Sequence, residues 1–469
     1  MRIRSVGLVL ALGLAGCGGQ QASGPASAPS ALVKDRTTAA ALRVGVAESA
    51  IAPLDGARKL PIDLPTALKL AAADNLQIAQ ARSRHQEAKA RKTRSAGALA
   101  PSLGVNAQTG SVDGRIQGSF GDLKDVTYDT ASLDGVLRWT LNPGESLFDY
   151  VAASRLAEAQ ASDAEATRQQ VLVWTSQRYD DLVRIQVSGT TLSQRLANSR
   201  RRWDLARVLA GKGLLSGLET SRLEGEVHQR EQELRQVEED FRQASTRLAE
   251  LLKLDPTVTL YPLDKECGER TLVDAELSLA DLVQVCDARN PGLESARKRV
   301  EAAAAAKKAA RWGMWSPAFG LSYLYGGAGA HFGSLNHRTI MGASGGWNPS
   351  ISKWGDVGVA EARQDLIGLS NDEAALRTHA SLVRAYEEVR SASDRARMAK
   401  AEVDASEAAL RAAVARRESG MIPESEVLQF QDLLAASRMR QVSAITDYNR
   451  AQAKLLAEVG EVGPDAWVP

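Results

Sequence analysis

The amino-acid sequence contains an internal repeat, and this duplication constrains the fold more than any other feature. In each copy an Asn begins a helical stretch rich in Ala, Arg and Lys: Asn75 in the first copy and Asn290 in the second. A Pro follows 26 residues after the first Asn and 27 residues after the second. Gly- and Ser-rich segments with alternating apolar residues come next, at 102–142 and 318–350. Because an internal repeat reflects a repeated structural unit, the two halves are predicted to fold alike.

Each copy continues into a long helical pattern that ends at a Gly. The first pattern runs from Glu145 to Lys212 without a Pro. At 1.5 Å per residue this helix would be about 100 Å long, more than a globular domain holds. Gly213 and Gly420 mark the two turns, and a heptad stripe over 223–251 predicts that the next helix folds back on the first. Long antiparallel coiled-coil helices are therefore expected.

The segments between the helices have the period of strands. Apolar residues alternate over 103–109 and 133–141 in the first copy, and over 319–325 and from Ile340 onward in the second. Such alternation over about ten residues is typical of transmembrane β-strands. After the N-terminus no run of eighteen apolar residues occurs, so a membrane would have to be crossed by strands closed into a barrel. Four strands cannot close around a pore, whereas three chains supply twelve, so a homotrimer is expected.

The N-terminus indicates export and lipidation. Arg2 and Arg4 precede an apolar run over 6–15, and small residues lead to Cys17. This order is typical of a secretory signal, and the Cys makes it resemble a bacterial lipobox with Cys17 as the acylated first residue. An ordinary signal peptide with a chance Cys is the alternative. Because Gly rather than Asp follows Cys17, the resemblance favours the outer membrane, where acyl chains would anchor the protein in lipid.

Composition and motifs argue against several classes of function. The 58 basic and 57 acidic residues nearly balance, so a nucleic-acid partner gains no support. Aromatic residues make up only 5%, which suits long helices. The five His are scattered, and only His331 and His337 lie close enough together for a metal site to be considered. No nucleophile triad, carboxylate pair or phosphate-binding loop is recognisable. Neither an enzyme nor a cofactor is expected.

Two Cys remain besides Cys17. Cys267 and Cys286 are nineteen residues apart, and in an oxidising periplasm such a pair is a plausible disulfide. Two buried thiols are the alternative, because Cys is often a small core residue. The disulfide is the favoured interpretation.

The lipobox, the two copies, the Pro before each strand pair and the Gly-marked turns together carry a family resemblance. Over about residues 60–460 the chain resembles the TolC-type outer-membrane efflux proteins of the lipidated, OprM/NodT-like branch. This resemblance implies a mainly α fold with a small β part. Three chains would form an α-helical barrel across the periplasm and a 12-stranded transmembrane β-barrel. It also implies two partners, a periplasmic adaptor protein and an inner-membrane pump.

The resemblance points to the two turns as the periplasmic tip, gate and adaptor contact. The candidate residues there are Gly213, Leu214, Glu219, Arg416, Arg417, Gly420, Met421 and Glu426. In relatives, acids at positions matching Glu219 and Glu426 help to close the tip. A plain preference for Glu at a helix start explains them equally well. Relatives often carry a Tyr three residues before the Gly, where this chain has Ala210 and Arg417, so any closure network must use other partners.

Six segments are expected: a lipoprotein signal peptide (1–16), a lipidated linker (17–58), a first repeat (59–262), a connector (263–278), a second repeat (279–460) and a tail (461–469). The expected function is the outer-membrane channel of a tripartite efflux system for small molecules. Alternatives are the outer-membrane channel of type I protein secretion and, in another class, a coiled-coil envelope lipoprotein without a pore. Nothing in the sequence identifies the exported substrate.

Overall fold

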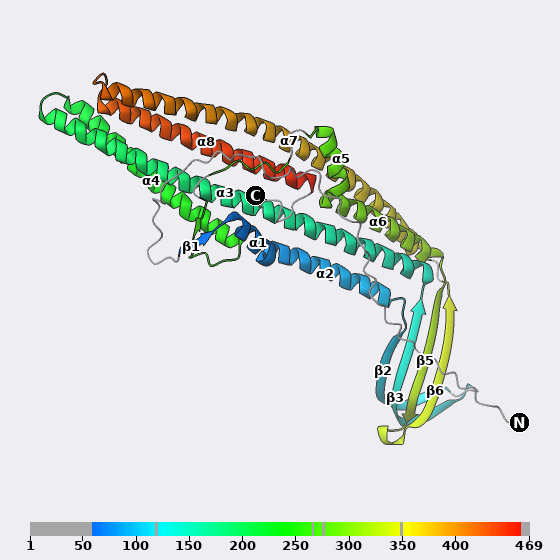
Figure 1. The fold of residues 1–469 in the computed structure, drawn as a ribbon. Coiled ribbons are helices and arrows are strands. Elements are labelled where there is room, and N and C mark those ends of the chain that lie inside the picture. The colour runs from blue at the N-terminus through cyan, green and yellow to red at the C-terminus, as the bar shows by residue number, and fades with distance from the viewer. Residues whose placement is uncertain (1–58, 118–120, 265–266, 274–276, 348–349, 461–469) are drawn as a thin grey trace.

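The computed structural model describes residues 59–117, 121–264, 267–273, 277–347 and 350–460. Within these residues the chain forms one elongated body, with long helices along most of its length and a sheet of strands at one end (Figure 1). The fold is mainly α with a small β part, as predicted. None of the helices described is both long and apolar enough to cross a membrane.

The same order of elements occurs twice. The first half contains β1 (Lys59–Ile62), α1 (Leu64–Asp74), α2 (Leu76–Gly97), β2 (Ser102–Gln117), β3 (Leu123–Leu141), α3 (Pro143–Gly211) and α4 (Gly217–Leu251). The second half contains β4 (Thr259–Pro262), α5 (Leu279–Arg289), α6 (Pro291–Trp315), β5 (Ala318–Gly329), the 3-10 turn η1 (Phe332–Ser334), β6 (Asn336–Gly346), α7 (Ile351–Glu418) and α8 (Glu424–Val459). The long helices α3 and α7 have 69 and 68 residues, so each is about 100 Å long.

One Asn in each half fastens two helices together. The side-chain oxygen of Asn75 accepts hydrogen bonds from two amides in the first turn of α2, at 2.8 and 3.3 Å. Its Nδ2 donates to the carbonyl of Leu251 at the end of α4, at 2.8 Å. In the second half, the side-chain oxygen of Asn290 accepts from two amides in the first turn of α6, at 2.9 and 3.2 Å. Its Nδ2 donates to the carbonyl of Glu458 near the end of α8, at 2.9 Å. Each Asn thus caps one helix and satisfies a terminal carbonyl of another.

Four strands form an antiparallel sheet in the order β2-β3-β5-β6. Their register places Leu103, Leu137, Tyr323 and Met341 in one row across all four strands. Side chains of alternate residues share a face of a sheet. This row and the rows two positions away along each strand therefore build one largely apolar face. The strands predicted from alternation are therefore confirmed.

The opposite face of the sheet mixes small, polar and apolar side chains and carries an ion pair. Asp134 in β3 and Arg338 in β6 meet at 2.5 Å, across the intervening strand β5. Gly326 lies between them in the register. A Cβ there would be 2.2 Å from the carbonyl oxygen of Leu133 and 2.5 Å from the Asp134 Cα. Only a Gly therefore fits beneath this ion pair.

The main apolar core lies around the middle of the helices. Among its fully buried side chains are Tyr179 in α3, Phe241 in α4, Leu382 in α7 and Ile445 in α8. A small parallel sheet of β1 and β4 lies beside it, and the sequence patterns did not predict this sheet. These elements join the two halves at mid-length.

The predicted disulfide is wrong, because Cys267 and Cys286 are free, buried thiols. Cys267 lies in the connector with its sulfur 3.5 Å from the hydroxyl of Thr446 in α8. Cys286 lies on the buried side of α5. The two side chains therefore pack in different surroundings. Burial raises the pKa of each thiol to about 11. The alternative of two buried thiols is the correct one.

Candidate functional site at the hairpin tips

The predicted tip residues lie in two helical turns at the same end of the molecule, opposite the sheet (Figure 1). One turn joins α3 to α4 and the other joins α7 to α8. Gly213 and Gly420 have φ angles of 71° and 74°, a left-handed conformation that favours Gly. The following amides, of Leu214 and Met421, donate to carbonyls five residues earlier at 3.0 and 2.9 Å. Both turns are therefore Schellman motifs with the same geometry.

Large apolar side chains at these turns project into solvent. Leu214, Leu218 and Met421 are 71%, 83% and 72% exposed. Exposed apolar side chains that gather at one place mark contact surfaces more often than isolated ones do. The tip of a single chain thus offers an apolar surface to another protein or another copy.

The charged residues of the tip pair within their own hairpins. Arg222 donates to both oxygens of Glu219, at distances from 2.6 to 3.1 Å, and holds the pKa of this carboxyl below its ordinary value. Arg417 contacts Glu424 at 2.7 Å. In the single chain Glu219 is therefore paired with Arg222, and not with the sequence-based candidates Arg416 and Arg417. Glu426 lies in the first turn of α8, and its amide donates to Pro423 at 3.1 Å, which agrees with a helix-start residue.

A buried charge cluster behind the tip was missed by the sequence reasoning. Arg202 of α3 is only 9% exposed and contacts Glu226 of α4 at 2.5 Å and Asp432 of α8 at 2.7 Å. Burial raises the pKa of Asp432, and the positive charge of Arg202 partly offsets this rise. This cluster connects the two hairpins. Only its three-helix packing identifies it, because nothing in the local sequence distinguishes Arg202 from its neighbours Arg200 and Arg201.

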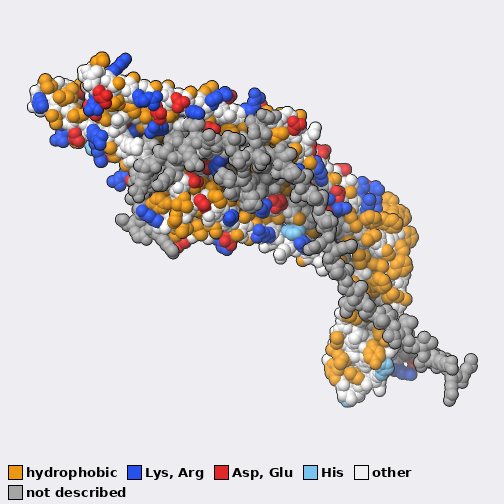
Figure 2. All heavy atoms as spheres, in the orientation of Figure 1, with side chains coloured by type: hydrophobic (Ala, Val, Ile, Leu, Met, Phe, Trp, Pro, Cys, Tyr) orange, Lys and Arg blue, Asp and Glu red, His pale blue; other side chains and the backbone are white. Residues whose placement is uncertain are grey.

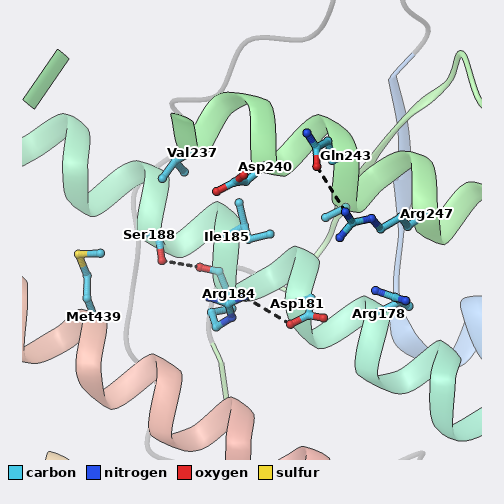
Figure 3. Close-up of a pocket in the computed structure, with 11 residues that line it drawn as sticks. Arg178, Asp181, Arg184, Ile185, Ser188, Val237, Asp240, Gln243, Arg247 and Met439 are labelled. Atoms are coloured by element: carbon cyan, nitrogen blue, oxygen red, sulfur yellow. Dashed lines mark hydrogen bonds and ion pairs between the residues drawn. The ribbon is translucent and has the colours of Figure 1, made fainter. Parts of the chain in front are cut away.

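A cavity of about 370 Å³ lies farther along the helices, between α3 and α4 (Figure 3). Three Arg and two Asp line it, with Met439 of α8 at its edge. Asp181 accepts hydrogen bonds from Arg184 at 3.5 Å and from Arg450 at 2.8 Å. Asp181 is thus already paired with two Arg. The hydroxyl of Ser188 in the lining donates to the carbonyl of Arg184 at 2.9 Å, so no base activates it as a nucleophile. Among the residues described, no group of three or more His, Cys, Asp and Glu could hold a metal ion.

Several predicted features lie outside the described residues. These are the signal peptide (1–16), Cys17 with the linker (17–58), and the tail (461–469).

Comparison with known proteins gives one family match and a group of similar structures. Residues 282–461 match the family model described as outer membrane efflux protein. No curated protein matches the chain. The outer membrane protein VceC of Vibrio cholerae has the same fold, with a TM-score of 0.72 and 18% identity over 85% of this chain and 96% of VceC.

Two outer-membrane channels are also similar in fold. The outer-membrane channel OprN gives a TM-score of 0.71 and 19% identity over 92% of this chain and 98% of OprN. The MtrE outer membrane channel of Neisseria gonorrhoeae gives a TM-score of 0.69 and 15% identity over 92% of this chain and 98% of MtrE. The resemblance to TolC-type outer-membrane efflux proteins is therefore confirmed. OprN and MtrE are described as channels, and the matches indicate no catalytic family.

Proposed function

We propose that three copies of this chain form an outer-membrane channel, the outer component of a tripartite efflux system. The observation that carries the proposal is an open sheet with one largely apolar face, and with the ion pair of Asp134 and Arg338 on its other face, attached to helices about 100 Å long. An apolar outer face and a polar inner face are what a barrel in lipid around a water-filled pore requires. The helices are long enough to carry that pore away from the membrane.

The edges of the sheet support assembly from several copies. β2 and β6 are its edge strands. An unpaired edge exposes amides and carbonyls, and in hydrocarbon each unsatisfied group costs several kcal/mol. Pairing β6 of one copy with β2 of the next removes every edge, and three copies make the twelve strands of the predicted barrel.

The long helix α7 supports the same assembly. Along its half nearest the sheet, exposed large apolar residues recur at steps of three and seven: Val359, Leu366, Leu369, Leu376 and Val383. A heptad seam of this kind fits a facing helix. Because the seam is exposed in the single chain, we infer that a neighbouring copy covers it.

The tip serves in this proposal as gate and adaptor contact. Each half of the chain supplies one tip, so a homotrimer brings six turns together. Glu219 and Glu426 then form a ring of six carboxylates that favours cations. The exposed Leu214 and Met421 are the expected contacts for a periplasmic adaptor, which connects the channel to an inner-membrane pump.

Planar-bilayer recording of the double variant Glu219→Gln, Glu426→Gln tests this role. We expect wild-type protein to conduct with a preference for cations and the variant to lose part of that preference. The matched control is Glu373→Gln, which removes an exposed, Arg-paired Glu of α7 far from the tip. Unchanged conductance and ion selectivity in the double variant would mean that these Glu only start their helices. A wild-type protein that never conducts would contradict the channel and favour a non-pore lipoprotein.

Anchoring in the membrane through acylated Cys17 is part of the proposal. The Cys17→Ser variant removes the thiol that would be acylated. Intact mass spectrometry should then show an uncleaved or unacylated chain. If wild-type and variant proteins share the same mature N-terminus and differ only by the substitution, Cys17 carries no lipid.

A further inference from the structure

Tryptophans gather where the helices meet the sheet. Trp312 and Trp315 end α6, Trp347 follows β6, and Trp354 lies in the first turn of α7. Their exposed fractions lie between 52% and 64%. Figure 2 shows hydrophobic side chains gathered over these helix ends next to the sheet. Exposed Trp is unusual in water but is enriched at membrane–water interfaces, where its amphipathic ring suits both sides.

A ring stack places Trp315 and Trp347 on the apolar side of the sheet. Trp347 continues the alternation of Met341, Ala343 and Gly345, the residues of β6 on the apolar face. Trp315 stacks on Trp347, with ring centroids 6.4 Å apart and planes 23° from parallel. The exposed stripe of α6 that contains Trp315 therefore continues the apolar face of the sheet.

A positive charge lies on the same stripe, farther from the sheet. Lys308 precedes Trp315 by seven residues, which is about two helical turns and about 10 Å. Its Nζ lies 5.7 Å from the centre of the Phe148 ring in α3. On the other side of α3, Lys92 of α2 lies 5.8 Å from the Tyr150 ring. Both rings belong to the first turns of α3, so the two ammonium groups flank the start of that helix.

The two lysines occupy matching places in the two repeats. Each stands nine residues before the Pro that precedes a strand pair, Pro101 for Lys92 and Pro317 for Lys308. Among the described residues, no carboxylate forms an ion pair with either ammonium, and the aromatic rings hold them in place. The repeat thus positions two uncompensated cations at the depth where the apolar surface ends.

We propose that Lys92 and Lys308 bind the phosphates of anionic phospholipids in the periplasmic leaflet of the membrane. This inference rests on the proposed insertion of the sheet in the outer membrane. The Trp rings would lie at the boundary of the hydrocarbon, and the ammonium groups about 10 Å farther out would lie among the headgroups. A Lys near an anionic membrane surface contributes about 1 kcal/mol to binding, which is about fivefold in affinity.

The test is native mass spectrometry of the full chain in detergent, delipidated and then titrated with phosphatidylglycerol or phosphatidylcholine. We expect wild type to retain phosphatidylglycerol preferentially. The double variant Lys92→Gln, Lys308→Gln should bind it about 25-fold more weakly, if each Lys contributes about fivefold. Lys92→Arg, Lys308→Arg should keep the preference. Lys69→Gln, an exposed lysine of α1 away from the sheet, is the matched control and should change nothing.

Three outcomes would overturn the proposal. One is equal retention of both lipids by wild type, and another is an undiminished preference in the Gln double variant. The third is displacement of phosphatidylglycerol by excess inorganic phosphate, which would indicate a site for the free anion. Conductance in bilayers of phosphatidylcholine alone tests the channel separately, so a conducting protein without lipid preference would refute only this inference.

Discussion

Removing the side chain of Asn75 should loosen two helices at once. Asn75→Ala deletes the N-cap of α2, which costs about 1 kcal/mol. It also leaves the Leu251 carbonyl without its donor in a site where Asn75 is only 4% exposed, which costs about 1–3 kcal/mol. The two effects together amount to about 2–4 kcal/mol of local opening free energy. At tenfold per 1.4 kcal/mol, amides in the first turn of α2 should exchange at least about 30-fold faster.

Hydrogen exchange measured by mass spectrometry can separate the two effects. Asn75→Ser keeps an oxygen that caps the helix, but its side chain is too short to reach Leu251. It should therefore protect the first turn of α2 about fivefold better than Asn75→Ala, while both variants loosen the end of α4. Asn290→Ala is the matched control, because it should affect α6 and α8 and leave α2 unchanged. If Asn75→Ala leaves exchange at both helix ends as in wild type, the fastening role is refuted.

Three other predictions follow from buried groups. Cys267 and Cys286 should both react with a thiol reagent after denaturation without reductant, whereas failure of both to react would restore the disulfide. Burial raises the pKa of Asp180 from 3.8 to about 6 in the folded protein. The protonated carboxyl therefore stabilises the fold fully below pH 3.8, and this stabilisation is lost as the pH rises through about 6. The melting temperature of Asp180→Asn should lack this pH dependence. Gly326→Ala should destabilise the sheet by about 1–3 kcal/mol through overpacking, whereas Gly104→Ala, whose Cβ meets nothing within 4 Å, should not. Equal stability of these two Gly variants would contradict the close approach.

The features predicted correctly from sequence are those with local or periodic signals. Asn75 and Asn290 are helix caps because their side chains reach amides two and three residues onward, a relation visible in any sequence. Gly213 and Gly420 end helices because their left-handed conformation is easily accessible to Gly. Alternation over 133–141 identified a strand because one face of the sheet is apolar.

The features that were missed depend on long-range packing. The strands β1 and β4 have four residues each, too few for a periodic pattern, and their paired residues are 200 positions apart in the sequence. The spacing of Cys267 and Cys286 fitted a disulfide, but the surroundings of each thiol decided the outcome. Arg202 is buried because acids from two other helices meet it, which no local pattern reveals.

Native mass spectrometry of the full chain in mild detergent distinguishes a trimeric channel from a single chain. In the proposed channel, neighbouring copies cover the open sheet edges and the exposed seam of α7, and a barrel of twelve strands takes three chains. We expect a single dominant species with three times the mass of the mature chain. A monodisperse monomer under conditions that preserve the fold would contradict the channel architecture.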